Sequence, residues 1–255
     1  MSRVYLLIML FSQLISVNTY SNDISVITDL DDTLKVTNSG NFRKAVVNAL
    51  FRVKAFTAMP DLLKEMEYYT NRTYVLSASP RIINKSIRKF LRVHKIKYDK
   101  LYTRNLKQLR NKFKYKVNTI RKIMKRSDDD FILIGDNVEI DDKVYLKIKE
   151  EFKDRVLKIY IHKIKNKTTK PGVYGYFTAL DIWKSEYLSG RMTMESLSNQ
   201  VEKFRNLSRK QLVRSFPKFA YCPKNKEDFT SIEIPSLVDS INEIHEKILK
   251  FCENR

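Results

Sequence analysis

Short apolar runs and helix-like repeats alternate along the first two thirds of the chain. A continuous apolar run is typical of a buried strand, and apolar residues that recur every three to four positions indicate a covering helix. The predicted strands are Ile24–Leu30, Arg72–Ser77, Lys100–Thr103, Phe131–Gly135 and Arg155–His162. The predicted helices are Asn41–Val53, Pro60–Thr70, a helix capped by Ser79 with Pro80 at its first position, one that includes Tyr115–Lys125, and Val144–Phe152. This alternation predicts a doubly wound α/β fold with a mostly parallel sheet.

The pattern changes after Lys163, where helical repeats prevail. The expected elements are a polar loop at Asn166–Gly175, helices at Thr178–Leu188 and Thr193–Phe204, and a final helix with the apolar stripe Leu237, Ile241, Ile244, Ile248 and Phe251. We therefore expect an α/β domain over residues 22–190 and an α-helical C-terminal extension over residues 191–255 that packs against it.

The first 21 residues have the pattern of a signal peptide. Arg3 supplies a positive charge, Val4–Val17 is mostly apolar, and Thr19–Ser21 offers small residues where a signal peptidase cleaves. The apolar run is short for a membrane span. An uncleaved anchor and a buried first helix are the alternatives. We expect an exported protein, either periplasmic or secreted.

The chain has two cysteines, Cys222 and Cys252, and both lie in the expected extension. An even number of cysteines in an oxidising compartment predicts a disulfide. Two unpaired buried thiols are the alternative.

The chain is strongly basic. Its 255 residues carry 49 Lys and Arg against 29 Asp and Glu, a net charge of +20. Such a surface favours anionic partners, including an anionic membrane surface. A compositional bias toward lysine explains the charge equally well. No nucleic-acid partner is expected, because no aromatic and basic nucleic-acid module is recognisable.

Several other site patterns are missing from the sequence. The three histidines show no zinc-binding spacing, and no glycine-rich nucleotide-binding loop of the GxxxxGK[ST] or GxGxxG kind occurs. The sequence therefore excludes these nucleotide sites and gives no support to zinc chemistry.

Acidic residues follow the first predicted strand. Asp29 and Asp31 stand two positions apart, and alternate side chains of an extended chain share a face. A carboxylate can attack a phosphorus centre, and a second carboxyl can protonate the leaving alkoxide and then activate water. A solvated turn is the alternative for such a short string, but the preceding apolar residues make it less fitting.

The other strand ends add groups that suit phosphate and metal. Ser77 ends the second strand, and the backbone N–H of Ala78 precedes a helix start, a pattern that favours an anion. A helix cap is the alternative for a serine in this position. Asp136 follows the longest apolar strand, and together with Asp141 it suits Mg²⁺. Glu139 and Asp142 could also bind the metal or could cap the next helix.

In order along the chain, DxDxT, a strand-terminal serine, a lysine and GDxxxxD resemble the four motifs of the haloacid dehalogenase superfamily of phosphatases. More narrowly, the chain resembles the catalytic domain of the actin-patch phosphatidate phosphatase family. The segments that carry this likeness are Ser25–Thr37 (SVITDLDDTLKVT), Leu76–Pro80 (LSASP), Tyr102–Arg104 and Phe131–Tyr145 (FILIGDNVEIDDKVY), and Arg155 and Lys158–His162 extend it. It covers roughly Ile24 to Leu188. The chain departs from the family pattern at Arg81, where an aromatic is usual, at Asn137-Val138 in place of Ser-Gly, and at His162 in place of Arg.

The resemblance implies a role for each site residue. Asp29 would be the nucleophile and a Mg²⁺ ligand, and Asp31 would be the general acid and base and would lend its backbone carbonyl to Mg²⁺. The remaining roles would be a loop brace for Thr33, phosphoryl binding for Ser77, Ala78 and Lys116, and metal binding for Asp136 and Asp141. Only the resemblance selects Lys116 from its many basic neighbours.

These observations favour an exported Mg²⁺-dependent phosphomonoesterase that acts through an aspartyl-phosphate intermediate. The resemblance implies phosphatidate or a related lipid phosphate as the substrate. A broad-specificity periplasmic acid phosphatase or nucleotidase is the first alternative. A non-catalytic basic protein that binds the envelope or nucleic acid is the second.

Overall fold

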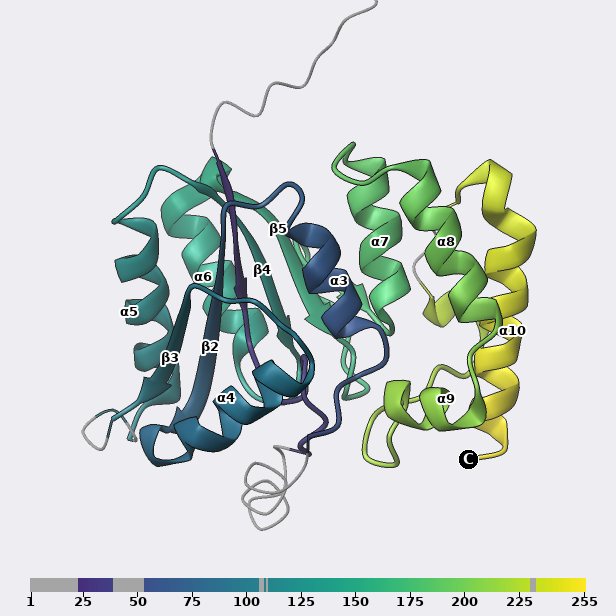
Figure 1. The fold of residues 1–255 in the computed structure, drawn as a ribbon, viewed down its shortest axis with the longest axis horizontal. Coiled ribbons are helices and arrows are strands. Elements are labelled where there is room, and N and C mark those ends of the chain that lie inside the picture. The colour runs from purple at the N-terminus through teal and green to yellow at the C-terminus, as the bar shows by residue number, and fades with distance from the viewer. Residues whose placement is uncertain (1–22, 39–52, 106–107, 109, 230–232) are drawn as a thin grey trace, which may run out of the picture.

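Six parallel strands form the central sheet of the computed structural model (Figure 1). The structure describes residues 23–38, 53–105, 108, 110–229 and 233–255, so the expected signal peptide and nearly all of the predicted helix Asn41–Val53 lie outside the described residues. The strands are β1 (Ile24–Thr28), β2 (Arg72–Pro80), β3 (Lys100–Arg104), β4 (Asp130–Asp136), β5 (Val156–His162) and β6 (Tyr174–Tyr176). Their order in the sheet is β3-β2-β1-β4-β5-β6, which confirms the predicted α/β fold.

Strand β1 lies between β2 and β4, and this places three strand ends side by side. Thr28, the last residue of β1, is in register with Val75 of β2 and Ile134 of β4. The side chains that follow these positions therefore leave the sheet at the same edge. In open parallel sheets, ligands bind at this carboxyl edge.

Helices cover both faces of the sheet (Figure 1). Helices α5 (Lys112–Met124) and α6 (Asp141–Phe152) cover one face, where Ile27 of β1 belongs to the same buried cluster as their apolar residues. The other face is covered by α3 (Met59–Met66), α4 (Asn84–Val93) and α7 (Ala179–Leu188), and here Val26 joins the core. Both faces of the sheet are thus buried, which explains the continuous apolar runs of its central strands.

Strand β2 continues further than the sequence predicted. The expected helix start at Pro80 is wrong, since Pro80 has an extended backbone and pairs with Arg104 of β3. A 3₁₀ turn at Arg81–Ile83 follows, and α4 begins at Asn84. Proline fits this position because its fixed φ suits an extended residue as well as a first helical turn. Strand β6 was not predicted, and it overlaps the end of the expected polar loop Asn166–Gly175.

The C-terminal extension is helical, as predicted. Helix α8 (Met194–Arg205) packs on α7, and α10 (Val238–Glu253) packs on α8, while the short α9 (Arg209–Ser215) was not predicted (Figure 1). Apolar residues of these helices join the core that lies beneath α7. None of the helices in the described ranges is long and apolar enough to cross a membrane.

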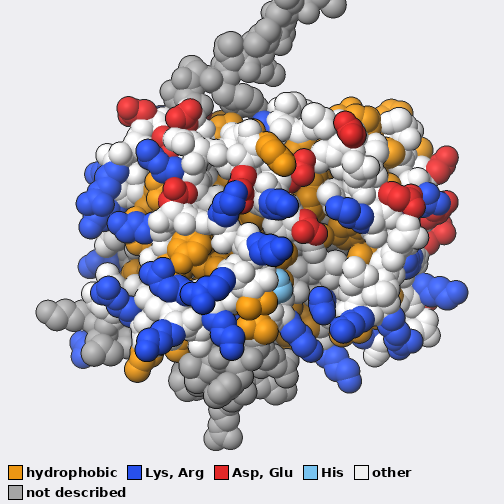
Figure 2. Space-filling model, in the orientation of Figure 1, with side chains coloured by type: hydrophobic (Ala, Val, Ile, Leu, Met, Phe, Trp, Pro, Cys, Tyr) orange, Lys and Arg blue, Asp and Glu red, His pale blue; other side chains and the backbone are white. Residues whose placement is uncertain are grey.

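Charge is unevenly distributed over the face shown in Figure 2. Acidic side chains lie mostly in the upper half and on the right of this view, and Lys and Arg dominate the lower half. Figure 1 has the same orientation, and its strands end at the lower edge of the view. The carboxyl edge of the sheet therefore lies on the more basic part of this surface.

A disulfide joins Cys222 to Cys252 of α10, as predicted. Its residues are 30 positions apart, and closing such a loop adds about 3–4 kcal/mol to stability in the chain-entropy model. We expect dithiothreitol to lower the urea midpoint of the wild-type protein by a corresponding amount. A Cys222→Ala/Cys252→Ala protein should already unfold at the lower midpoint, and dithiothreitol should not change it. An equal response in both proteins would contradict this prediction.

Candidate active site

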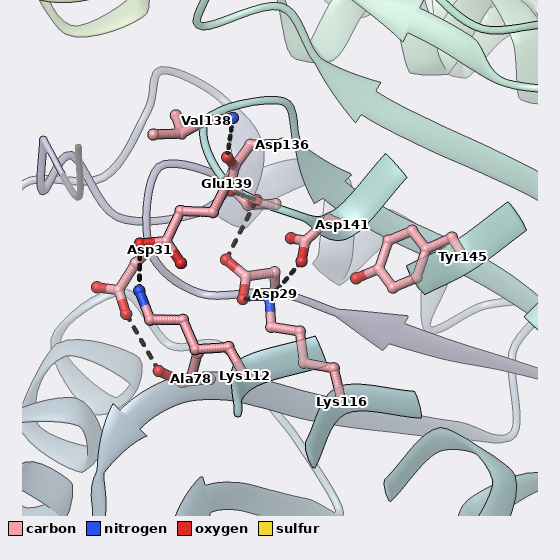
Figure 3. A network of polar contacts seen from close by, with 12 residues as sticks. Asp29, Asp31, Ala78, Lys112, Lys116, Asp136, Val138, Glu139, Asp141 and Tyr145 are labelled. Carbon is pink, nitrogen blue, oxygen red and sulfur yellow. Dashed lines mark hydrogen bonds and ion pairs between the residues drawn. The ribbon is translucent and has the colours of Figure 1, made fainter. Parts of the chain in front are cut away.

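Three carboxylates converge at the carboxyl edge of the sheet. Asp29 directly follows β1, Asp136 is the last residue of β4, and Asp141 opens α6. All three are buried, and one oxygen of each lies within 4.8 Å of the others. Figure 3 shows their side chains turned toward one another. The edge predicted from the sequence thus forms one acidic cluster.

Lys116 supplies the positive charge of this cluster. Its Nζ donates to Asp29 Oδ1 at 2.6 Å and to Asp141 Oδ1 at 2.5 Å (Figure 3). Helix α5 begins where the Asn111 side chain accepts the N–H of Lys114, which places Lys116 in the second turn, facing the sheet. Lys112, one turn earlier, instead pairs with Glu139 at the surface. Geometry thus selects the lysine that only the resemblance had picked out.

Burial and mutual repulsion set the protonation of the cluster. Burial, opposed by Lys116, raises the pKa of Asp29 well above its usual value. Burial and the neighbouring Asp141 and Asp29 raise the pKa of Asp136 in the same direction. Burial alone would lower the pKa of Lys116, but the charges of Asp141 and Asp29 outweigh it and raise the pKa. One ammonium faces three carboxyls, so the cluster has a deficit of positive charge.

The donor set fits Mg²⁺. Asp141 Oδ2 is buried and has no hydrogen-bond partner, so one carboxylate oxygen of the cluster is left for a ligand. Three carboxylates with room for water and phosphate oxygens match the hard oxygen ligands that Mg²⁺ prefers. Gly135 leaves space for Asp141, because a Cβ there would lie 2.7 Å from Asp141 Oδ2. The carboxylate of Asp31 lies outside this set, and the role predicted for its backbone carbonyl stays a prediction.

Asp31 has a separate environment. Its Oδ2 accepts hydrogen bonds from Ser77 Oγ at 3.1 Å and from Ser79 Oγ at 2.9 Å. Burial raises its pKa, while the nearby Lys35 ammonium and the two hydroxyls oppose this. Lys35 is itself buried, and burial lowers its pKa. Two carboxyls two residues apart therefore differ in their surroundings, which suits different roles in acid–base chemistry.

The loop after β1 is held by its own polar side chains. Thr33 Oγ1 lies 3.5 Å from Asp29 Oδ2 and 3.3 Å from Asp136 Oδ2, and its predicted bracing role stays a prediction. Asp32 has a φ of 61°, and its Oδ1 accepts the N–H of Thr37 at 3.0 Å. These contacts fix the turn that carries Asp29 and Asp31.

His162, which stands where the family has arginine, supports this turn from β5. Its Nδ1 lies 3.0 Å from the carbonyl oxygen of Asp32, and its ring stacks on Tyr176. Burial lowers the pKa of His162 to about 4, so the ring is neutral near pH 7. The neutral His162 ring thus packs beneath the turn and hydrogen-bonds to it, a role that the sequence pattern did not reveal.

Hydrogen bonds hold the Ser77–Ala78 segment of β2 on both sides. Ser77 Oγ accepts the N–H of Ser79 at 3.0 Å, and Arg104 Nε donates to the carbonyl oxygen of Ala78. The hydroxyl of Ser77 is therefore close to Asp31, and its predicted contact with phosphate, like that of Ala78 N–H, stays a prediction. Ser79, expected as a helix cap, bonds Asp31 instead because the strand continues past it.

Two alternative metal ligands lie elsewhere. Glu139 pairs with Lys112, and Asp142 Oδ2 pairs with Lys170 Nζ at 2.8 Å. Among the described residues, the group with metal-binding geometry is Asp29, Asp136 and Asp141. Three residues near the site lie in the segments that carry the family resemblance but were given no role in the site: Ser79, Lys35 and Arg104. Their signal was faint, since a serine near a proline and single basic residues are common on helices and loops.

A parallel sheet, a DxDxT loop after its central strand and a lysine set between acidic strand ends define a phosphatase of the haloacid dehalogenase type. The family described as "Phosphatidate phosphatase APP1, catalytic domain" matches residues 24–163. The chain belongs to this family, as its resemblance had indicated, and it is a phosphatase by that membership. A search among curated proteins finds no match.

Two solved structures match the chain at low similarity. A chain in "Structure of Pnkp1/Rnl/Hen1 complex" is 19% identical with a TM-score of 0.38 and covers 62% of this chain. A chain in "Structure of the Pnkp1/Rnl/Hen1 RNA repair complex" is 18% identical with a TM-score of 0.32 and covers 66%. The match spans 46% and 40% of those chains, respectively. Nothing about substrate follows from likeness at this level.

Proposed function

We propose that the protein is an exported, Mg²⁺-dependent phosphomonoesterase that hydrolyses phosphatidate or a related lipid phosphate through an aspartyl-phosphate intermediate. The observation that carries the proposal is that Asp29 and Asp31 lie in different surroundings. Asp29 lies against Lys116 and two further carboxylates, whereas Asp31 lies against two serine hydroxyls.

In the first step, a carboxylate oxygen of Asp29 attacks the phosphorus of the ester. The bond between phosphorus and the leaving alkoxide breaks, and protonated Asp31 gives its proton to that oxygen. The raised pKa of Asp31, which follows from its burial, favours a carboxyl that holds a proton to higher pH than an exposed aspartate does. The products of this step are the free alcohol and phosphorylated Asp29.

In the second step, Asp31 acts as a base. It takes a proton from a water molecule whose oxygen attacks the phosphorus, and the acyl-phosphate bond breaks to release inorganic phosphate. Asp29 regains its carboxylate and Asp31 its proton, so the site returns to its starting state. Lys116, held 2.6 Å from Asp29, orients the nucleophile and offsets the phosphoryl charge.

Asp29, Asp136 and Asp141 would hold Mg²⁺, and the bound ion supplies positive charge that favours approach of the anionic ester to an anionic nucleophile. The ligand set has the composition and burial that this role needs. The hydroxyl of Ser77 and the N–H of Ala78 are the groups we assign to the remaining phosphoryl oxygens.

Substrate and location are inferred from different features. Family membership over residues 24–163 supports a lipid phosphate as the substrate. The disulfide supports an oxidising compartment outside the cytoplasm, together with the signal-like N-terminal pattern. The net charge of +20 supports contact with an anionic membrane surface.

A phosphate-release assay tests the proposal. With Mg²⁺, the protein should hydrolyse phosphatidate in mixed micelles with a higher kcat/KM than it shows for nucleoside monophosphates or sugar phosphates, and EDTA should stop the reaction. Faster turnover of the soluble esters would assign the protein to broad-specificity scavenging. Release from none of these esters would exclude catalysis on them and favour a binding protein.

The hydrogen bond from Ser79 to Asp31 predicts a change in pH dependence. A hydroxyl that donates to a carboxylate stabilises its charged form and lowers its pKa. Ser79→Ala should therefore raise the pKa of Asp31 and move the corresponding inflection of kcat/KM to higher pH. Ser86→Ala, in α4 and outside the site, is the control and should leave the profile in place. An unmoved inflection in Ser79→Ala would contradict the assignment of Asp31.

A further inference from the structure

A basic groove runs beside the candidate active site. It has a volume of about 620 Å³ and is lined by residues that follow β2, by β3 and by α5 as far as Lys122. Its lining includes five basic side chains and no acidic one: Arg81, Arg88, Arg110, Lys114 and Lys122. All five are exposed, and among the described residues Arg81, Arg110 and Lys114 form no ion pair with an acid. Repulsion within the groove is thus relieved only by solvent ions or by an anionic ligand.

The groove is joined to the active site by two short segments. Arg81 follows the Ser79–Pro80 pair, and Ser79 bonds Asp31. On the other side, Lys114 precedes Lys116 of the acidic cluster by two residues in α5. The end of the groove at Arg81 therefore lies near the active-site residues, at the carboxyl edge where basic side chains prevail (Figure 2).

Two exposed apolar side chains neighbour groove residues in the sequence. Ile82, next to Arg81, is 88% exposed, and Phe113, next to Lys114, is 39% exposed. Soluble polyanions give no reason for exposed isoleucine and phenylalanine beside the basic side chains. An anionic bilayer does, because basic side chains bind its headgroups while apolar side chains enter the interface below them.

We propose that this groove, together with Ile82 and Phe113, docks the protein on a bilayer that contains anionic phospholipid. Phosphate headgroups occupy the groove, and Ile82 enters the interface between acyl chains and headgroups. The inference rests on the proposed function in one respect, namely that docking then presents the active-site entrance to lipid phosphates in the same leaflet. Binding itself requires no turnover.

Vesicle co-sedimentation tests the surface directly. The vesicles contain phosphatidylcholine alone or phosphatidylcholine with phosphatidylglycerol, a phosphodiester that leaves catalysis out of the readout. Full-chain proteins with the same N-terminus, determined by mass spectrometry, are compared. We expect binding to the anionic vesicles only, and weaker binding as salt rises, because the attraction is screened.

Two variants probe the two components of the surface. Arg110→Gln/Lys114→Gln should weaken binding by roughly thirtyfold at low salt, from the attraction of two basic side chains to an anionic surface. Ile82→Ser should weaken it by about tenfold through lost insertion of its apolar side chain. Circular dichroism checks that each variant is folded.

The matched controls lie away from the groove. Lys203→Gln/Lys250→Gln removes two exposed charges from α8 and α10 of the C-terminal extension, and Tyr68→Ser removes an apolar side chain that is 82% exposed before β2. Both should bind vesicles as the wild type does. Equal losses in these controls, or no loss in the groove variants, would overturn the proposal. Loss in the charge variant with full binding by Ile82→Ser would overturn the insertion of Ile82 into the interface. An inactive enzyme that still binds in the expected pattern would refute the proposed function alone.

Discussion

Asp29→Asn should abolish phosphate release, with a fall in kcat of at least about a thousandfold, as expected when a covalent nucleophile is lost. Asparagine keeps the shape of the side chain, but its amide is a poor nucleophile and cannot form the acyl phosphate. Lys116 retains its hydrogen bond to Asp141, so the cluster keeps one of its two ion pairs. Phosphate release and the free energy of unfolding, measured on the same preparation, separate lost chemistry from lost folding.

Asp31→Asn is the matched comparison, because it removes the acid and base but keeps the nucleophile. With an ester whose leaving group needs no proton, such as p-nitrophenyl phosphate, the first step should continue while water attack slows. Acid-quenched Asp31→Asn protein should then carry one phosphoryl group by mass spectrometry, and Asp29→Asn should carry none. A phosphorylated Asp29→Asn protein, or one with wild-type turnover, would show that another residue is the nucleophile.

The strands and the acidic residues at their ends could be predicted from the sequence, because both are local properties. An apolar run followed by Asp29 or by Asp136 specifies a buried strand and a polar end without knowledge of the rest of the chain. Parallel pairing then brings those ends together, since neighbouring strands share one carboxyl edge. The convergence of Asp29 with Asp136 is the consequence that the structure confirms.

Features that depend on distant partners could not be predicted in this way. Lys116 differs from Lys112 and Lys114 only in the face of α5 on which it lies. That face meets the carboxyl edge of the sheet, where Lys116 reaches Asp29. Ser79 looked like a helix cap because Pro80 suits a first helical turn as well as an extended strand, and only pairing with β3 decides between them. Because β2 continues through Ser79, the Ser79 hydroxyl reaches Asp31 and gives it surroundings that differ from those of Asp29.

Lys116→Met should make the fold depend on the metal. Removing one partner of a buried ion pair leaves uncompensated charge and costs about 3–5 kcal/mol, so the metal-free variant should unfold at a much lower temperature than the wild type. Mg²⁺ can replace the missing positive charge among Asp29, Asp136 and Asp141, so it should raise the melting temperature more in the variant. Thermal unfolding with EDTA and with Mg²⁺ measures both effects.

The stability that Lys116→Met loses should also depend on pH. Without Lys116, which now lowers the pKa of Asp29, that pKa rises further above its unfolded value. A carboxyl with a raised folded-state pKa destabilises the fold as pH rises from its unfolded value toward its folded one, so the deficit should shrink toward about pH 4. Lys112→Met is the control, since its pair with Glu139 has side-chain exposures of 41% and 31% and should contribute at most about 1 kcal/mol. Equal deficits in the two variants, or a Lys116→Met deficit that Mg²⁺ and acid leave unchanged, would show that Lys116 does not balance the charge of the carboxylates.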